Sequence, residues 1–348
     1  MIASNVTIES NIKSALADFF SATQFSAVFV LVDENTAKHC LPIIQDVLPE
    51  FWSVEIKSGE EEKHIETCAR IWRSMTEAKL DRKALMVNLG GGVIGDMGGF
   101  CAGTYKRGIS FINVPTTLLA QVDASVGGKL GIDFDGYKNH IGLFKEPDHV
   151  FIAPGFLKTL SGRELRSGFA EVVKHAYIRD QDYLKSIKSV ELDDQPWSER
   201  IDHSINIKSE VVAEDPTEQG LRKILNFGHT VGHAIETTYL ETPKKLLHGE
   251  AIAVGMICEL YLSHKLLEVD KEMVDQESQY LAALFDSTVI DKADFEQIVG
   301  HALQDKKNEG GVVKMSLLRA VGDCTYDIPV SSADMLDSLF YFNTVVDC

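Results

Sequence analysis

The chain has 348 residues, of which 45% are hydrophobic and 25% charged, so it is long enough for two domains and a sizeable core. A formal net charge of −18 disfavours nucleic acid and anionic membrane, and we expect neither as a partner. The first twenty residues show no basic segment followed by an apolar one, so no signal peptide is predicted. The six cysteines are scattered without a C-x-x-C pair, which favours reduced thiols and a cytoplasmic location.

The first half of the chain alternates compact apolar runs with stretches of helical spacing. Strands are predicted at 26–32, 83–89, 110–117 and 149–154, and a helix is predicted at 64–80. Strands separated by helices indicate a parallel sheet in an α/β domain. The acidic run GEEEK at 59–63 is, by default, a solvated turn.

The pattern changes after Pro154, where strand signals become rare. Helical patterns fill 162–178, 197–215, 226–240 and 249–267, and a later strand is predicted at 312–322. We therefore expect an α/β N-terminal domain at 1–154 and a mainly α-helical C-terminal domain at 155–348.

A glycine-rich segment follows the strand predicted at 83–89. Residues 90–95 read GGGVIG and match G-x-G-x-x-G, a pattern that lets backbone amides approach a pyrophosphate at a helix N-terminus. The usual acidic residue about 20 positions later is missing, because the next acid after Asp96 is Asp123. A packing or turn cluster of glycines is the alternative.

Basic residues beside glycines are conspicuous in so acidic a chain. Lys106-Arg107-Gly108, Gly127-Gly128-Lys129 and Lys138-Asn139 lie close together in sequence, and further cations follow at Lys174, Lys208, Arg222, Lys306 and Lys307. Such cations suit a small polyanionic substrate with phosphate and carboxylate groups. The alternative is that each lysine is a solvated surface residue.

Histidine and glutamate side chains in helical segments form a candidate metal site. His229 and His233 stand four apart in NFGHTVGHAIE and would project from one helix face. Glu171 and His248 lie in two other apolar helical stretches, and one glutamate with two histidines is a known catalytic zinc set. Spacing alone favours His229 and His233 as paired ligands. Thr230 stands where an H-E-x-x-H metalloprotease has glutamate, which excludes that class.

These segments together resemble the 3-dehydroquinate synthase family, within the sugar phosphate cyclase superfamily. The resemblance covers roughly residues 28–322, and its segments occur in the family's order: 90–100, 104–108, 114–129, 138–142, 157–160, 168–175, 208–215, 220–236 and 248–256. It implies a Rossmann-like N-terminal domain, bound NAD, a divalent metal (Zn²⁺ or Co²⁺) and a homodimer.

The resemblance also implies roles for particular residues. The metal ligands are then Glu171, His229 and His248, and His233 becomes a group on the substrate side. The groups around the reacting hydroxyls are Lys174, Asn226, His233, Asp123 and Glu218. Substrate phosphate meets Lys129, Asn139, one of Lys306 and Lys307, and Arg107 from the partner subunit, while substrate carboxylate meets Lys208 and Arg222. The cofactor-side residues are Asp33, Glu60, Lys63, Gly91, Gly92, Val93, Gly95, Asp96, Thr116, Thr117, Asp123, Lys129, Lys138, Thr159, Leu160 and Glu164.

The activity that the resemblance implies is the conversion of an anionic sugar phosphate, 3-deoxy-D-arabino-heptulosonate 7-phosphate, to 3-dehydroquinate and phosphate in the shikimate pathway. Transient oxidation by NAD, phosphate elimination, reduction and aldol closure make up the reaction. Three alternatives remain open at this point: another sugar phosphate cyclase, a polyol dehydrogenase on the same scaffold, and a non-catalytic NAD-binding protein.

Overall fold

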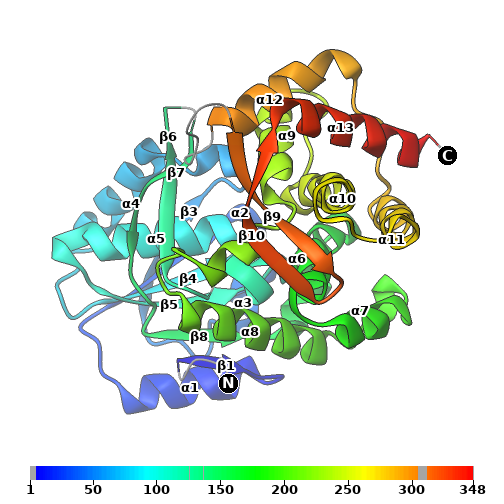
Figure 1. Cartoon of the computed structure of the whole chain (residues 1–348). Coiled ribbons are helices and arrows are strands. Elements are labelled where there is room, and N and C mark those ends of the chain that lie inside the picture. Colours follow the sequence, from blue (N-terminus) through cyan, green and yellow to red (C-terminus); the bar gives the residue numbers. More distant parts are fainter. Residues whose placement is uncertain (1–4, 125, 136, 305–311, 348) are drawn as a thin grey trace. The chain divides into compact units, whose positions relative to one another are not determined.

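The computed structural model describes residues 5–124, 126–135, 137–304 and 312–347 (Figure 1). The chain divides into two compact units: unit 1 comprises residues 1–165 and 196–209, and unit 2 comprises residues 166–195 and 210–348. Lys306 and Lys307, two of the predicted phosphate-binding residues, lie outside the described residues. No helix in the described part of the chain is long and apolar enough to cross a membrane.

Unit 1 is built on a parallel six-stranded sheet with the strand order β1-β8-β5-β4-β2-β3. The α/β class predicted for the first half is confirmed. The central strands are buried along almost their whole length, as expected for a parallel sheet covered on both faces. The strands are β1 (Val6–Ile8), β2 (Val28–Asp33), β3 (Phe51–Ile56), β4 (Leu85–Gly90), β5 (Ser110–Pro115) and β8 (His149–Ile152).

Helices cover both faces of this sheet, so unit 1 has two hydrophobic clusters. Phe29 and Leu31 of β2 join the cluster formed with α4 and α5, whereas Val28 and Val30 join the cluster with α1, α2 and α3. This alternation follows from the two-residue period of a strand. The helices are α1 (Ile12–Ala22), α2 (Glu34–His39), α3 (Leu41–Ile44), α4 (Ile65–Glu77) and α5 (Gly92–Thr104).

The carboxyl ends of the parallel strands lie at one edge of the sheet, where α/β proteins commonly bind ligands. β2, β4 and β5 lead there into Glu34, Gly91 and Thr116. A separate antiparallel pair, β6 (Lys129–Phe134) and β7 (Tyr137–Phe144), packs on α5. These segments carry most of the residues predicted to bind the cofactor.

Unit 2 is mainly helical, as predicted, and is organised around α10 (Figure 1). Almost every residue of α10 from Gly249 to Ser263 is buried, because α9, α11, α13 and β9 all pack against it. Helices α6 and α8 begin in unit 1 and end in unit 2. The elements are α6 (Gly162–Arg179), α7 (Gln181–Lys188), α8 (Trp197–Glu214), α9 (His229–Tyr239), α10 (His248–Leu267), α11 (Lys271–Leu284), α12 (Phe295–Gln304), α13 (Ser332–Val346), β9 (Val312–Ala320) and β10 (Asp323–Ser331).

The helix predicted at 226–240 begins later than expected. A 3₁₀ helix ends at Asn226, and α9 begins only at His229. Gly228 separates the two with a positive φ of 80°, a conformation that glycine adopts without strain. Asn226 therefore lies outside the helix that carries His229 and His233, and the prediction of one continuous helix is wrong for its first three residues.

Candidate active site

Helix α6 supplies a buried carboxylate and a buried ammonium to unit 2. Glu171 and Lys174 are 0% and 1% exposed, respectively, and lie one turn apart. Lys174 Nζ donates to Glu171 Oε2. Burial raises the pKa of Glu171, but the charges of Lys174 and His229 and the hydrogen bonds of His229 and His248 together outweigh it and hold the pKa well below its usual value. Glu171 is therefore ionised although it has no contact with solvent.

The second oxygen of Glu171 faces two histidines. Oε1 lies 3.4 Å from His229 Nε2 and 3.6 Å from His248 Nε2. It is buried and has no hydrogen-bond partner among the described residues. A buried carboxylate oxygen without a donor is costly, so this oxygen favours a cation beside it, either a protonated imidazole or a metal ion.

Both histidines use Nδ1 for contacts that point Nε2 toward Glu171. His229 Nδ1 lies 3.1 Å from the carbonyl oxygen of Phe227, and His248 Nδ1 lies 3.3 Å from Glu236 Oε2. Histidines that ligate a metal through Nε2 commonly donate Nδ1–H to such oxygens. Burial lowers the pKa of His248, but the carboxylates of Glu171 and Glu236 outweigh it and raise the pKa to about 9.

His233 belongs to the same cluster. Its ring centroid lies 5.1 Å from that of His229 and 5.7 Å from that of His248. Each of these three histidines offers a nitrogen within 4.8 Å of the others. The structure thus brings together all four residues that the sequence suggested for a metal site, and His233 stays a candidate alongside Glu171.

The segment before α9 carries the other predicted groups of unit 2. Asn226 Nδ2 donates to Glu218 Oε1 at 2.6 Å, and Arg222 Nη1 donates to the carbonyl of Pro216 at 2.7 Å. Asp215 organises this segment, because its carboxylate accepts from the amides of Gln219, Gly220 and Arg222. Glu218 has a positive φ of 59° within this turn.

In unit 1 the glycine motif forms the turn between β4 and α5, as its pattern predicted. Gly91 is the N-cap of α5 and provides no side chain to its first amides. A Cβ atom on Gly91 would lie 3.0 Å from Thr117 Cγ2, and the Thr116 amide donates to the Gly90 carbonyl at 3.0 Å. The predicted cofactor residues Gly91, Gly92, Val93 and Gly95 therefore lie in or directly after this turn, and Thr116 and Thr117, which follow β5, lie beside it.

A buried lysine connects three segments beside the glycine turn. Lys63 is only 5% exposed, and its Nζ donates to Asp96 Oδ2 at 2.6 Å and Asn139 Oδ1 at 2.7 Å. Glu60 Oε1 lies 3.9 Å from Lys63 Nζ and 3.7 Å from Lys138 Nζ. Burial lowers the pKa of Lys63, but the charges of Asp96 and Glu60 outweigh it and raise the pKa above its usual value. We name Glu60, Lys63, Asp96, Lys138 and Asn139 the lysine cluster.

Lys208 and Asp123 form a second buried contact in unit 1. Lys208 Nζ lies 2.8 Å from Asp123 Oδ1 and donates to its carbonyl oxygen at 2.6 Å. Asp33 caps α2, and Thr159 Oγ1 lies 3.7 Å from Cys40 Sγ. The other predicted residues of this unit are less enclosed: Lys129, Leu160, Glu164 and Arg107.

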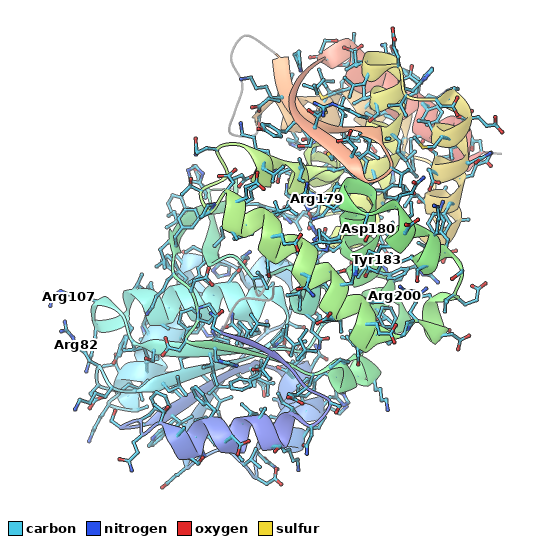
Figure 2. The ribbon with its side chains drawn as sticks, turned by 60° about the horizontal axis from the view of Figure 1, so that its bottom comes forward. Arg82, Arg107, Arg179, Asp180, Tyr183 and Arg200 are labelled. Atoms are coloured by element: carbon cyan, nitrogen blue, oxygen red, sulfur yellow. The ribbon has the colours of Figure 1, made fainter. Side chains whose placement is uncertain are left out.

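Arg107 lies apart from the clusters described above. It is exposed, has a φ of 68°, and occupies the outer edge of unit 1 near Arg82 (Figure 2). Arg82 Nε donates to the carbonyl of Lys106, the residue before it. The side chain of Arg107 is therefore not among the buried groups of unit 1 described above.

Some carboxylates that contact residues of the unit 2 site were not predicted from the sequence. They are Asp215, Glu236, which contacts His248, and Glu259, which contacts the start of α9. Glu236 had a usable signal, since it stands seven residues after His229 and so on the same helix face. Glu259 had none, because an acidic residue within an apolar helix identifies no particular contact.

Comparison with known proteins agrees with this architecture. The family model described as 3-dehydroquinate synthase N-terminal matches residues 53–167, and the model described as 3-dehydroquinate synthase C-terminal matches residues 168–308. A 3-dehydroquinate synthase from Parabacteroides distasonis is 40% identical over 348 residues, which cover 98% of each chain.

Two solved structures are similar over nearly the whole chain. One is 2-deoxy-scyllo-inosose synthase complexed with carbaglucose-6-phosphate, NAD⁺ and Co²⁺ (25% identity, 96% of this chain, 95% of that chain, TM-score 0.83). The other is 2-epi-5-epi-valiolone synthase from Streptomyces hygroscopicus subsp. jinggangensis with NAD⁺ and Zn²⁺ (24% identity, 99% of this chain, 98% of that chain, TM-score 0.87).

The parallel sheet with its glycine turn, the helical unit and the glutamate–histidine cluster define the class: the fold is that of the sugar phosphate cyclases. Within that class, the two family models and the 40% identity to the Parabacteroides distasonis protein point to one family. The chain belongs to the 3-dehydroquinate synthase family.

Proposed function

We propose that the chain converts 3-deoxy-D-arabino-heptulosonate 7-phosphate to 3-dehydroquinate and inorganic phosphate, the activity for which its relatives are named. The observation that carries the proposal is the convergence of Glu171, His229 and His248 around a buried oxygen without a hydrogen-bond donor. This proposal makes the protein a lyase of the shikimate pathway that serves aromatic amino-acid biosynthesis. Its partner would be a small anionic sugar phosphate.

The donor set fits a divalent metal. Glu171 Oε1 lies 3.4 and 3.6 Å from the two Nε2 atoms, and a tetrahedral site with bonds of about 2.0–2.2 Å separates its ligand atoms by roughly 3.3–3.6 Å. A ligating imidazole must be neutral, so a bound metal would replace the proton that the raised pKa of His248 favours. We therefore assign Glu171, His229 and His248 as ligands of Zn²⁺ or Co²⁺, and His233 as a group that faces the substrate.

The glycine turn and the lysine cluster fit a nicotinamide dinucleotide. The start of α5 offers backbone amides without a side-chain cap, as required for a pyrophosphate. Asp96 and Asn139 orient Lys63, which fixes this cationic group beside the glycine turn. We assign NAD to this turn, to the lysine cluster and to the other predicted cofactor residues at the carboxyl edge of the sheet. In this proposal the predicted domain 1–154 supplies most of the NAD-binding residues, and the predicted domain 155–348 supplies the metal ligands and most of the substrate-binding residues.

When bound, NAD supplies a reversible hydride acceptor and the divalent metal a Lewis acid for the same substrate hydroxyl. The chain's own residues then hold the substrate and its protons. Lys174 keeps Glu171 ionised through Oε2, which leaves Oε1 available. Glu218 orients the Asn226 amide so that its oxygen can accept from a substrate hydroxyl. A His233 ring nitrogen can hold a proton beside the ligand set.

Cations hold the two anionic ends of the substrate in this proposal. Arg222 and Lys208 are both buried, and each is positioned by a backbone carbonyl, that of Pro216 for Arg222 and that of Asp123 for Lys208. They are assigned to the carboxylate. Lys129, Asn139 and one of Lys306 and Lys307 are assigned to the phosphate, together with Arg107 of a partner subunit in a homodimer. Holding both ends fixes the reacting atoms relative to each catalytic group. The proposed location is cytoplasmic.

The test is phosphate release from the heptulosonate phosphate in the presence of NAD and Zn²⁺. The proposal expects phosphate and 3-dehydroquinate in equal amounts, dependence on both cofactors, and no net NADH. Net accumulation of NADH would identify a polyol dehydrogenase instead, and a different cyclised product would identify a sister cyclase. No metal-dependent phosphate release at all would refute the proposed activity.

A further inference from the structure

The start of α9 is stabilised by a residue from another helix. The first amides of a helix have no acceptor within the helix and need one from a cap. The N-cap of α9 is Gly228, which has no side chain to provide it. The acceptor is Glu259 of α10, whose Oε2 lies 2.6 Å from the Gly228 nitrogen. Burial raises the pKa of Glu259 to about 8, although backbone hydrogen bonds from Gly228, Val231 and Thr230 act to lower it.

Close packing of α9 on α10 brings Glu259 to this position. A Cβ atom on Gly255 would lie 1.9 Å from the carbonyl oxygen of Gly228, and one on Gly232 would lie 3.0 Å from the carbonyl oxygen of Ala251. The two helices therefore approach backbone to backbone, which no larger residue at Gly255 would permit. At this separation, a side chain from α10 can reach the first amides of α9.

The contact at Glu259 has a counterpart at the start of α10. There, Glu236 of α9 contacts Nδ1 of His248, the first residue of α10. Each helix thus supplies a carboxylate to the beginning of the other, and each beginning carries one of the histidines assigned to the metal, since His229 is the first residue of α9. The relative position of His229 and His248 depends on both contacts.

A carboxyl group at position 259 is costly to bury. Glu259 is 0% exposed, and its Oε1 has no hydrogen-bond partner among the described residues. Its unpaired oxygen costs free energy that an apolar side chain of similar volume would avoid. The carboxylate is therefore better explained by what it positions than by the free energy of unfolding.

We infer that Glu259 is a positioning residue that holds the beginning of α9, and with it His229, in the place where His229 and His248 share Glu171. The inference rests on the metal site of the proposed function. Glu259 acts through an acceptor oxygen, so glutamine should replace it and an apolar residue should not.

The test compares Glu259→Met and Glu259→Gln with the wild-type chain. Methionine fills a similar volume without an acceptor, whereas glutamine keeps the oxygen. Zinc affinity is measured by competition with a chelator, and the visible absorption of the Co²⁺ form reports the ligand geometry. We expect Glu259→Met to weaken zinc binding by about 10- to 100-fold, the range for outer contacts of metal ligands. Glu259→Gln keeps the acceptor oxygen and should bind zinc as tightly as the wild type.

A matched control comes from the same helix. Ser263, also 0% exposed, accepts the Leu318 amide at 3.0 Å and donates to the Glu259 carbonyl oxygen at 2.7 Å, and neither of these hydrogen bonds goes to α9. Ser263→Ala should lower the thermal midpoint without changing zinc affinity or the Co²⁺ spectrum. This control separates a loss of general stability from a displaced ligand.

The outcomes distinguish this inference from the proposed function. Zinc affinity that is unchanged in Glu259→Met, or weakened equally in Glu259→Gln, would overturn the positioning role alone. No zinc binding by the wild-type chain would overturn the metal site as well. If Glu259→Met does not fold, hydrogen exchange of the wild-type chain decides: the Gly228 amide should exchange as slowly as the centre of α10, and exchange at the rate of a frayed helix end would overturn the inference.

Discussion

The lysine cluster of unit 1 and the glutamate–histidine cluster of unit 2 (Glu171, His229, His233 and His248) balance buried charge in different ways. Both place charged groups out of water. In unit 1, Lys63 has two close acceptors, Asp96 and Asn139, so its charge is balanced by the chain itself. In unit 2, Lys174 occupies one oxygen of Glu171, and the other faces two histidines without a donor. The charge of Lys63 is balanced by neighbouring side chains, whereas Glu171 Oε1 has two imidazole nitrogens beside it, an arrangement typical of a metal site.

Of the substitutions that distinguish the two clusters, Glu171→Ala should have the largest effect. It removes the oxygen on which both histidines converge, so zinc affinity should fall by more than the roughly 100-fold of an outer-contact change. Zinc content after dialysis and initial rates of phosphate release measure the effect. Glu171→Gln is the matched control: it keeps the size of the side chain but not its charge, and should also lose the metal. Wild-type zinc content in Glu171→Ala would remove Glu171 from the ligand set.

The pH dependence of stability tests the second buried carboxylate of unit 2. The pKa of Glu259 rises from an ordinary value of 4.5 to about 8 in the fold, so the folded state favours the neutral form. Its stabilising contribution is complete below pH 4.5 and is lost as the pH rises toward 8, by at most about 1.4 kcal/mol per pH unit. The wild-type chain should therefore lose stability relative to Glu259→Gln over this range. Urea denaturation curves whose difference stays constant with pH would contradict the raised pKa.

Lys63→Met should show that the stability of the lysine cluster depends on the ammonium that neutralises its carboxylates. The change leaves Asp96 and Glu60 without the ammonium between them, and breaking such a buried pair costs about 3 kcal/mol. Urea denaturation measures the loss, and the KM for NAD should rise. Lys63→Met with Asp96→Asn should recover part of the stability, because no unbalanced carboxylate then remains at position 96. Equal stability of the single and double variants would mean that the pair is not coupled.

Lys138→Met should have the smallest effect and sharpens the contrast within unit 1. Lys138 Nζ lies 3.7 Å from Glu60 Oε1 and is more exposed than Lys63. A pair of this kind contributes at most about 1 kcal/mol. The free energy of unfolding should therefore change far less than in Lys63→Met. A loss as large as that of Lys63→Met would mean that the whole cluster, and not Lys63, carries the stability.

The sequence predicted the parts of the fold that local patterns encode. The apolar runs at 26–32, 83–89 and 110–117 correspond to β2, β4 and β5, whose residues are buried on both faces. Strand β3 escaped prediction because it lies at the edge of the sheet and most of its residues are exposed or half-buried. The glycine turn was predicted at its observed place, since a strand, glycines and a helix follow one another directly.

The site was less predictable where its contacts are distant in sequence. Lys63 belongs to a run that looks like a solvated turn, yet it is buried against Asp96 and Asn139. These two residues lie 33 and 76 positions away in the sequence, so no local pattern reveals the contact. The same limit applies to the histidines. Spacing favoured His233, which is four residues from His229, over His248, which comes from another helix. A local pattern does not report which helix faces Glu171.

The metal content of His229→Ala and His233→Ala tests the ligand assignment most directly. Both variants are purified in the same zinc-containing buffer, dialysed and analysed for metal and for phosphate release. If Glu171, His229 and His248 bind the metal, His229→Ala loses both zinc and activity. His233→Ala then keeps its zinc while its activity falls. Equal loss of zinc from the two variants would contradict the assignment.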